Sequence, residues 1–241
     1  MDKELVSVIR DRYAATQQKI AEAARKAGRD PVDVKTLVVT KRQPLSVVLA
    51  TIEAGIELLG ENYPEEAVKK KQSFGDENKV EWHMIGHVQS RKARLVTENF
   101  DLLHSMDSLK LARRLDRFCA EAGLKLPVLL QFNVGGEANK SGWDAANKSE
   151  WDAFLPDVAD ILELRHLDVR GLMTMPPFFD EAELARPYFA QLRELRDYLA
   201  AQHPEVKWEQ LSMGTSGDFH IAVEEGATIV RLGQIILGPR S

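Results

Sequence analysis

Short apolar runs alternate with helical patterns along almost the whole chain, and this alternation restricts the fold more than any other feature. Eight runs have the character of strands, at residues 36–40, 57–60, 81–86, 101–105, 127–134, 166–173, 208–213 and 228–232. Helical patterns lie between them, at about 45–54, 64–73, 89–98, 107–122, 149–163, 187–200 and 217–225. Strands that alternate with helices predict a parallel sheet, because each helix returns the chain to the end where the previous strand began.

Eight strand–helix units predict an α/β fold in which one sheet closes on itself, a single (β/α)8 or TIM barrel. The whole chain, residues 1–241, is expected to form one domain. Apolar residues at helical spacing predict an extra N-terminal helix packed on the barrel within 1–28, which Gly28 ends. An open, doubly wound sheet is the alternative, but the motifs G-x-G-x-x-G and G-x-x-x-x-G-K-[ST] are both absent.

Charge and cysteine content exclude several classes of protein. The formal net charge is −5, which argues against nucleic acid or a membrane surface as partner, because both attract basic faces. Cys119 is the only cysteine, so no internal disulfide forms. The N-terminal segment lacks the apolar stretch of a signal peptide, and no apolar run is long enough to span a bilayer. We therefore expect a cytoplasmic protein.

The C-terminal ends of the predicted strands carry polar residues or glycines, and in a barrel these ends meet at one rim. The residues that we expect at the site are Lys41, Asn62, His83, Ser105, Met173, Ser212, Met213, Gly214, Thr215, Arg231, Gly233 and Gln234. No metal site is expected, because His83 and His87 straddle a strand end and catalytic zinc normally needs three protein ligands.

Two glycine turns, in SMGTSGDF and RLGQ, follow the last two predicted strands. Loops in these positions often bind phosphate through backbone N–H groups. A simpler interpretation is that Gly214 and Gly217 only shape a turn, while Asp218 caps a helix.

Lys41 follows the first strand, where partial desolvation lowers the pKa of an amine and favours its neutral form. A neutral amine condenses with an aldehyde to give an imine. Pyridoxal 5′-phosphate (PLP) carries both an aldehyde and a phosphate, and Arg231 on the last strand is expected near its pyridine ring. An aldolase-like barrel, in which Lys41 attacks a sugar-phosphate carbonyl, is an alternative.

Seven motifs make the chain similar, over almost its whole length, to the pyridoxal phosphate homeostasis protein family. They are VVTKRQP, GENYPEEAVKK, WHMIGHVQSRK, HSMDSLKLA, LLQFNVGGEANKSG, RGLMTMPP and LSMGTSGDFHIAVEEGATIVRLGQIILG. The resemblance implies a fold-type III PLP protein, a barrel like the N-terminal domain of alanine racemase. It also implies that Lys41 holds PLP as a Schiff base, with Asn62 beside the ring and Arg231 facing the pyridine nitrogen.

The resemblance also places Ser212 and the Gly233-Gln234 turn at phosphate-binding positions, in a loop lined by Met213, Gly214 and Thr215. The chain departs from the family pattern at Gln234, where serine or threonine is usual, so the backbone N–H is expected to contact the phosphate at this position. It departs again at Leu237, which replaces an aromatic residue, and at Thr215, where methionine is common.

The implied function is PLP binding in intracellular vitamin B6 homeostasis, as a carrier or regulator without catalysis. We expect no second domain of the racemase kind, because the predicted barrel extends almost to Ser241. Apo forms of PLP enzymes are candidate clients, and a monomer or weak dimer is expected. A fold-type III enzyme with weak racemase or lyase activity is the alternative.

Three other features have simple interpretations. The run KKK at 69–71 is expected to be a solvated helix end, and Cys119 is expected to be inert on a helix. Lys140, in the glycine-rich loop 135–142, is a spare amine at the rim.

Overall fold

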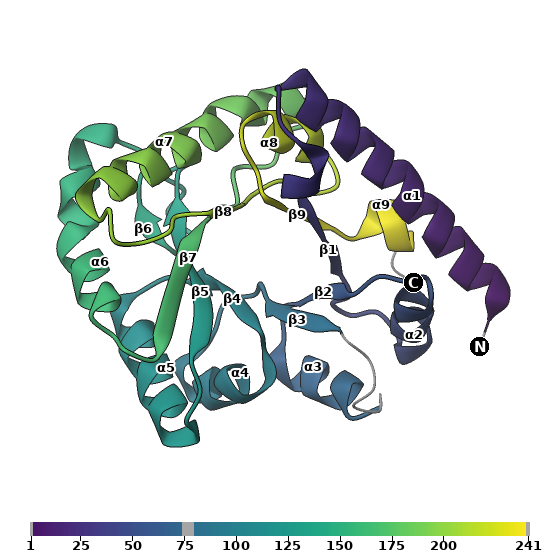
Figure 1. Cartoon of the computed structure of the whole chain (residues 1–241), viewed down its shortest axis with the longest axis horizontal. Coiled ribbons are helices and arrows are strands. Elements are labelled where there is room, and N and C mark those ends of the chain that lie inside the picture. The colour runs from purple at the N-terminus through teal and green to yellow at the C-terminus, as the bar shows by residue number, and fades with distance from the viewer. Residues whose placement is uncertain (1, 74–79, 240–241) are drawn as a thin grey trace.

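The computed structural model describes residues 2–73 and 80–239, and in them eight parallel strands close into a barrel (Figure 1). The strands are β1 Lys35–Val39, β2 Leu58–Glu61, β3 Glu81–Met84, β4 Leu102–Met106, β5 Leu126–Asn133, β7 Leu167–Met173, β8 Gln210–Ser212 and β9 Ile229–Leu232. Neighbours follow the order β4-β3-β2-β1-β9-β8-β7-β5, and pairing of β4 with β5 closes the ring. The prediction of a TIM barrel is confirmed, and the open sheet is excluded.

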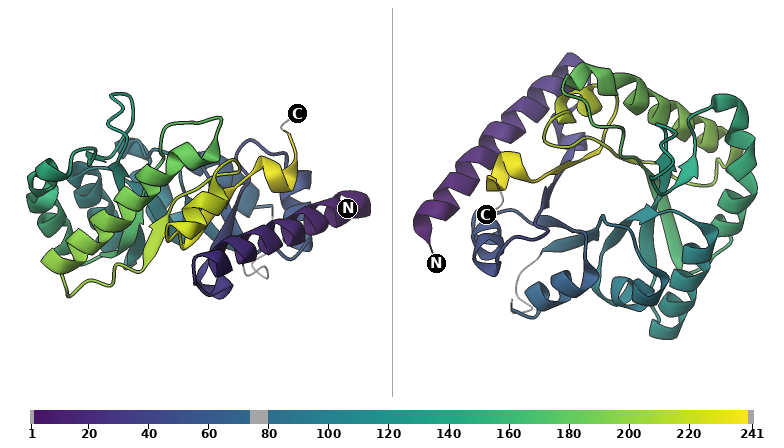
Figure 2. Two further views of the ribbon diagram at one scale, coloured as in Figure 1. Left: turned by 90° about the horizontal axis from the view of Figure 1, so that it is seen from above. Right: turned by 180° about the vertical axis from the view of Figure 1, so that it is seen from behind.

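Helices surround the ring of strands on the outside (Figures 1 and 2). They are α1 Lys3–Lys26, α2 Leu45–Glu53, α3 Pro64–Lys71, α4 Ala93–Asn99, α5 Leu109–Ala122, α6 Leu155–Leu162, α7 Arg186–Gln202, α8 Phe219–Glu224 and α9 Gln234–Leu237. Short 3-10 helices lie at η1 Pro31–Asp33, η2 Ser90–Lys92, η3 Lys148–Phe154 and η4 Ala182–Ala185.

Helix α5 illustrates how the sequence sets an element. Ser108 caps its N-terminus by accepting a hydrogen bond from the backbone of Leu111, and Gly123 ends it in the left-handed conformation with φ 66°. Leu115 and Cys119 lie on its buried face. Burial raises the pKa of the Cys119 thiol to about 11, so this cysteine stays in its unreactive protonated form.

The N-terminal helix α1 lies along the outside of the barrel, against α2, α8 and α9 (Figure 2). Its Asp2 cap accepts hydrogen bonds from the backbone N–H groups of Glu4 and Leu5. Its own residues Ile9 and Ile20 are buried on the side that packs on the barrel. Nowhere in residues 2–73 and 80–239 is a helix both long enough and apolar enough to cross a bilayer.

Apart from the short 3-10 helices η1 and η4, two elements were not expected from the sequence. A two-residue strand, β6 (Trp143–Asp144), extends the pairing of β5 within the rim loops, and α9 follows Gly233. The helices expected at 89–98 and 149–163 each begin as 3-10 turns, η2 and η3. Residues 1, 74–79 and 240–241, which the expected domain includes, lie outside the described residues.

The interior of the barrel has its own small core, separate from the larger core between strands and helices. Its buried members are Leu37, Leu102, Leu129, Met173 and Ile229. Because side chains alternate along a strand, every second residue from these positions also faces inward. This alternation directs several polar side chains toward the barrel axis, and they form the site.

Candidate functional site

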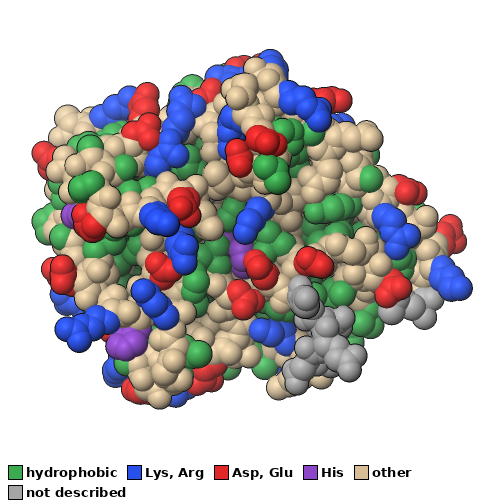
Figure 3. Space-filling view, in the orientation of Figure 1, with side chains coloured by type: hydrophobic (Ala, Val, Ile, Leu, Met, Phe, Trp, Pro, Cys, Tyr) green, Lys and Arg blue, Asp and Glu red, His purple; other side chains and the backbone are tan. Residues whose placement is uncertain are grey.

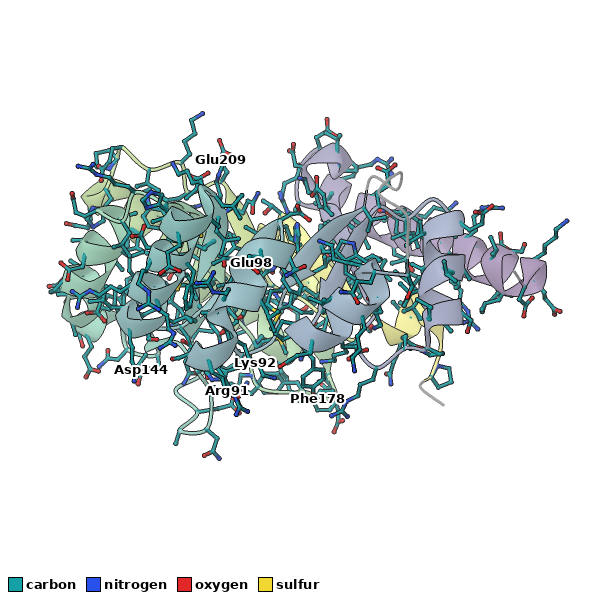
Figure 4. All side chains as sticks on the ribbon, turned by 90° about the horizontal axis from the view of Figure 1, so that it is seen from below. Arg91, Lys92, Glu98, Asp144, Phe178 and Glu209 are labelled. Carbon is teal, nitrogen blue, oxygen red and sulfur yellow. The ribbon has the colours of Figure 1, made fainter. Side chains whose placement is uncertain are left out.

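A cavity of about 550 Å³ opens at the C-terminal ends of the strands. Figure 4 shows Arg91, Lys92 and Phe178, from loops that follow strands, at one edge of the molecule, with Glu209 at the opposite edge. Seven of the predicted site residues line this cavity together: Lys41, Asn62, Met173, Thr215, Arg231, Gly233 and Gln234.

The other five predicted residues lie close by but do not line the cavity. His83 and Ser212 are buried in the barrel interior. Ser105 follows the inward-facing His104, and its hydroxyl donates to the carbonyl of Gly86 at 2.6 Å. Met213 packs fully buried in the outer core, and Gly214 shapes the turn behind the wall.

The backbone on both sides of Lys41 is held by an ionic cluster that Lys70 and Glu66 of α3 form with the buried Glu61 of β2. Lys70 Nζ donates to the carbonyl of Thr40 at 2.8 Å and forms ion pairs with Glu61 at 2.7 Å and Glu66 at 2.6 Å. The expectation of a solvated helix end at 69–71 is therefore wrong for Lys70, which is 6% exposed. Its charge is satisfied inside the protein because two carboxylates reach it.

Residue 42 completes this arrangement with an uncommon backbone conformation. Arg42 has φ 58°, which non-glycine residues rarely adopt. Its N–H donates to Glu66 at 2.7 Å, and its guanidinium donates to the Tyr63 hydroxyl at 3.0 Å. These contacts fix the turn that carries Lys41 to the cavity. Burial raises the pKa of Glu61, and its contact with Lys70 opposes that rise.

Asn62 faces the cavity with a buried amide oxygen that has no hydrogen-bond partner among the described residues. Gly86 makes its position possible, because a Cβ there would come within 2.4 Å of the Asn62 carbonyl oxygen. An unsatisfied polar atom is costly in a protein interior. Its presence on a cavity wall indicates a place where a ligand supplies the missing donor.

A tight turn after β8 forms another part of the cavity wall. Gly214 has φ 90°, and a Cβ there would meet Ala222 at 2.6 Å. Asp218 accepts from the backbone N–H of Thr215 at 2.6 Å and from its hydroxyl at 3.1 Å. The Asp218 side chain makes no cap to α8, so it holds the turn instead.

Arg231 lies in the cavity wall and is buried, with 5% of the residue exposed. It donates to the Ser212 hydroxyl at 2.6 Å and to the carbonyl of Thr174 at 2.8 Å. Burial lowers its pKa to about 10, which still leaves it a cation at neutral pH. In the described part of the chain, no three histidine, cysteine or carboxylate side chains gather as metal ligands would.

The expected site residues do not include the residues that support the site: Glu61, Glu66, Lys70, Gly86 and His104. A signal existed for two of them. Lys70 lies three positions after the buried Ala67, on the same helix face, and His104 shares the strand alternation of Leu102. The others depend on contacts between distant segments.

Comparison with known proteins gives a consistent relationship. The family model of the alanine racemase N-terminal domain matches residues 12–241. The chain is 40% identical over 220 residues to a pyridoxal phosphate homeostasis protein of Vibrio alginolyticus, covering 90% of this chain and 91% of the relative.

Solved structures agree with this relationship. PipY of Synechococcus elongatus, determined with PLP bound, matches with a TM-score of 0.81 at 34% identity, over 95% of this chain and 100% of that one. An alanine racemase from Streptomyces coelicolor shares the fold, with a TM-score of 0.70 at 18% identity over 96% of this chain and 58% of that one. The chain belongs to the pyridoxal phosphate homeostasis protein family, which is built on the fold of the alanine racemase N-terminal domain.

Proposed function

We propose that this protein binds PLP in the cavity at the C-terminal rim of its barrel and takes part in vitamin B6 homeostasis. One observation carries the proposal: Lys41 and Arg231 line the same cavity, with the glycine turns of β8 and β9 beside them. The curated relatives are named for PLP homeostasis rather than for a reaction, and the structure of PipY was determined with PLP bound. A carrier or regulator without turnover fits these names.

The residues on the cavity wall fit the three chemical parts of PLP. When bound, PLP supplies an aldehyde that condenses reversibly with an amine, and Lys41 is the residue that we propose for this bond. Arg231 cannot give up its proton, so it favours an unprotonated ring nitrogen and weak electron withdrawal. Gly233 and the turn at 214–218 leave backbone room for the phosphate.

Retention of PLP can be tested with purified protein and its Lys41→Ala variant. The wild-type protein incubated with PLP is expected to show a yellow absorbance band after dialysis, and borohydride reduction is expected to fix the cofactor on the peptide that contains Lys41. Lys41→Ala is expected to lose the band while keeping its circular dichroism. Lys35→Ala, at the opposite end of β1, serves as the control lysine and is expected to stay yellow.

The same preparation separates the alternatives. A reduced adduct on Lys140, which also lines the cavity, would move the proposed bond to another loop. If the protein is colourless and borohydride reduction attaches a sugar phosphate to it, the aldolase-like alternative is supported. Racemisation of L-alanine or L-serine by the PLP-loaded protein would support an enzyme. Against an enzyme, no tyrosine is among the described residues that line the cavity, and Tyr63 is bonded to Arg42 instead.

Further parts of the proposal concern the context of the molecule. We propose that residues 1–241 work as one domain in the cytoplasm, as a monomer or weak dimer. The clients that we propose are apo forms of PLP enzymes, with no nucleic acid or membrane involved. The net charge of −5 supports this choice, because it disfavours polyanionic partners.

A further inference from the structure

Four inward-facing side chains, beginning with Arg231 on the cavity wall, form a chain of hydrogen bonds across the barrel. Arg231 Nη1 lies 2.6 Å from Ser212 Oγ, which lies 2.8 Å from His104 Nδ1. His104 Nε2 lies 2.9 Å from His83 Nδ1. His83 Nε2 then lies 3.6 Å from a carboxylate oxygen of Glu81, the first residue of β3. The chain links the cavity wall to the opposite rim.

The inner members of this chain are buried. His104 and Ser212 are 0% exposed, and His83 is 4% exposed, whereas the Glu81 side chain is 61% exposed. In the end-on view, one histidine side chain can be seen among charged side chains near the middle of the face shown (Figure 3). Burial, together with the nearby His83 and Arg231, keeps the pKa of His104 well below its usual value.

The direction of every hydrogen bond in the chain follows from Arg231. A guanidinium only donates, so Ser212 Oγ accepts from it. The hydroxyl hydrogen of Ser212 then points to His104 Nδ1, its other neighbour within bonding distance. A neutral imidazole that accepts at Nδ1 carries its hydrogen on Nε2, which donates to His83 Nδ1. The opposite tautomer of His104 would leave the buried Ser212 hydroxyl without an acceptor.

We propose that His104 is a positioning residue: through Ser212 it holds the Arg231 guanidinium in the one orientation that faces the cofactor ring. This inference rests on the proposed PLP site, because Arg231 acts there, but the bond pattern itself belongs to the protein without ligand. Among the described residues, the Arg231 guanidinium makes two further hydrogen bonds, to the Thr174 carbonyl and the Met175 sulfur at 2.8 Å each. Without an acceptor for the Ser212 hydroxyl, that hydroxyl turns and the guanidinium loses its fixed neighbour.

The first experiment measures the tautomer of His104 in the wild-type protein without PLP. Nitrogen-15 NMR of the histidine side chains, assigned by comparison with His104→Asn, is expected to show neutral His104 with its hydrogen on Nε2 from pH 6 to pH 8. A hydrogen on Nδ1, or a charged ring, would overturn the proposal. This result does not depend on PLP binding, so it stands apart from a failure of the proposed function.

The second experiment measures PLP affinity and the pH profile of the PLP absorbance in variants. His104→Leu removes the acceptor and is expected to weaken PLP binding by about tenfold and to shift the pH profile. His104→Asn keeps an acceptor oxygen near the position of Nδ1 and is expected to restore most of the affinity. Adding Ser212→Ala to His104→Leu is expected to cost little more, because both changes break one chain.

Thr51→Val is the control for loss of a buried hydroxyl elsewhere. Thr51 is fully buried in α2, and its hydroxyl donates to the Val47 carbonyl at 2.7 Å. If folded His104→Leu binds PLP as Thr51→Val does, with an unchanged pH profile, the positioning role is wrong. If His104→Leu does not fold, the tautomer measurement on the wild-type protein decides.

Discussion

Two glycines beside the cavity differ in what they do, and substitution by alanine separates the roles. Gly214 has φ 90° and no room for a Cβ, which would meet Ala222 at 2.6 Å. Gly233 has φ −117°, which any residue adopts, and a Cβ there would lie 3.5 Å from the Val39 carbonyl oxygen, an ordinary contact. Gly214 therefore serves the fold, whereas Gly233 leaves space in the cavity.

Gly233→Ala is expected to change the free energy of unfolding by less than about 1 kcal/mol while weakening PLP binding by at least about tenfold. Gly214→Ala is expected to destabilise the protein by about 1–3 kcal/mol, because alanine resists a positive φ. Urea unfolding and a titration of absorbance with PLP measure the two effects. Equal affinities for wild type and Gly233→Ala would remove this turn from the proposed phosphate site.

At this scale the sequence predicted which strand ends meet, but not which neighbouring side chain turns inward. Lys41, Asn62 and Arg231 were placed at the rim from pattern alone, and they line one cavity. At the end of β4 the expectation fell on Ser105, while His104 is the residue that faces the axis. Side chains alternate with a period of two, so an uncertainty of one residue in a strand exchanges inside for outside.

Helix α3 covers the barrel and also places a charged side chain, Lys70, in the protein interior. Lys70 is enclosed by Glu61 and Glu66, and it also binds the carbonyl beside Lys41. The run of three lysines is typical of a solvated helix C-terminus, because lysine has a high helix propensity and its charge interacts favourably with the helix dipole there. Only the approach of β2 to the helix reveals that one lysine is buried, and such contacts are invisible in a single sequence.

Lys70→Met is expected to lower the free energy of unfolding by about 3–5 kcal/mol, because Glu61 would remain buried without a cation. Lys69→Met, on the exposed side of the same helix, is the matched control and is expected to change it by less than about 0.5 kcal/mol. Adding Glu61→Gln to Lys70→Met is expected to recover part of the loss. Denaturant unfolding of the ligand-free proteins measures all three, and a loss equal to that of Lys69→Met would contradict the burial of this charge.

The stability of the whole molecule is expected to depend on pH through His104. Its pKa is lowered in the folded protein, so below the ordinary histidine value of about 6.5 the unfolded chain binds a proton that the folded state refuses. The contribution of His104 to the free energy of unfolding is therefore fully present above about pH 6.5. Below that pH the contribution falls by up to about 1.4 kcal/mol per pH unit. Urea unfolding of wild type and His104→Asn at pH 7.5 and 5.5 checks the difference, since other titrating groups are common to both. Equal losses of stability would exclude His104 as the source.

The closed ring as a whole could be predicted because eight repeated units leave few ways to bury both faces of a parallel sheet. The short β6 and α9 could not, because segments of two and four residues carry no periodicity to detect. The hydrogen-bonded chain through the barrel was equally hidden, since its members come from β3, β4, β8 and β9.

The seam of the ring joins β1 to β9, the first strand to the last, while α1 packs against α8 and α9. During synthesis, Lys41 therefore leaves the ribosome long before Arg231. The cavity is complete only once the final strand has been synthesised and has paired with β1. Until then the edge of β1 stays without its second partner. A ligand that contacts both Lys41 and Arg231 stabilises the pairing of β1 with β9. Ligand binding is therefore coupled to the last step in the folding of the chain.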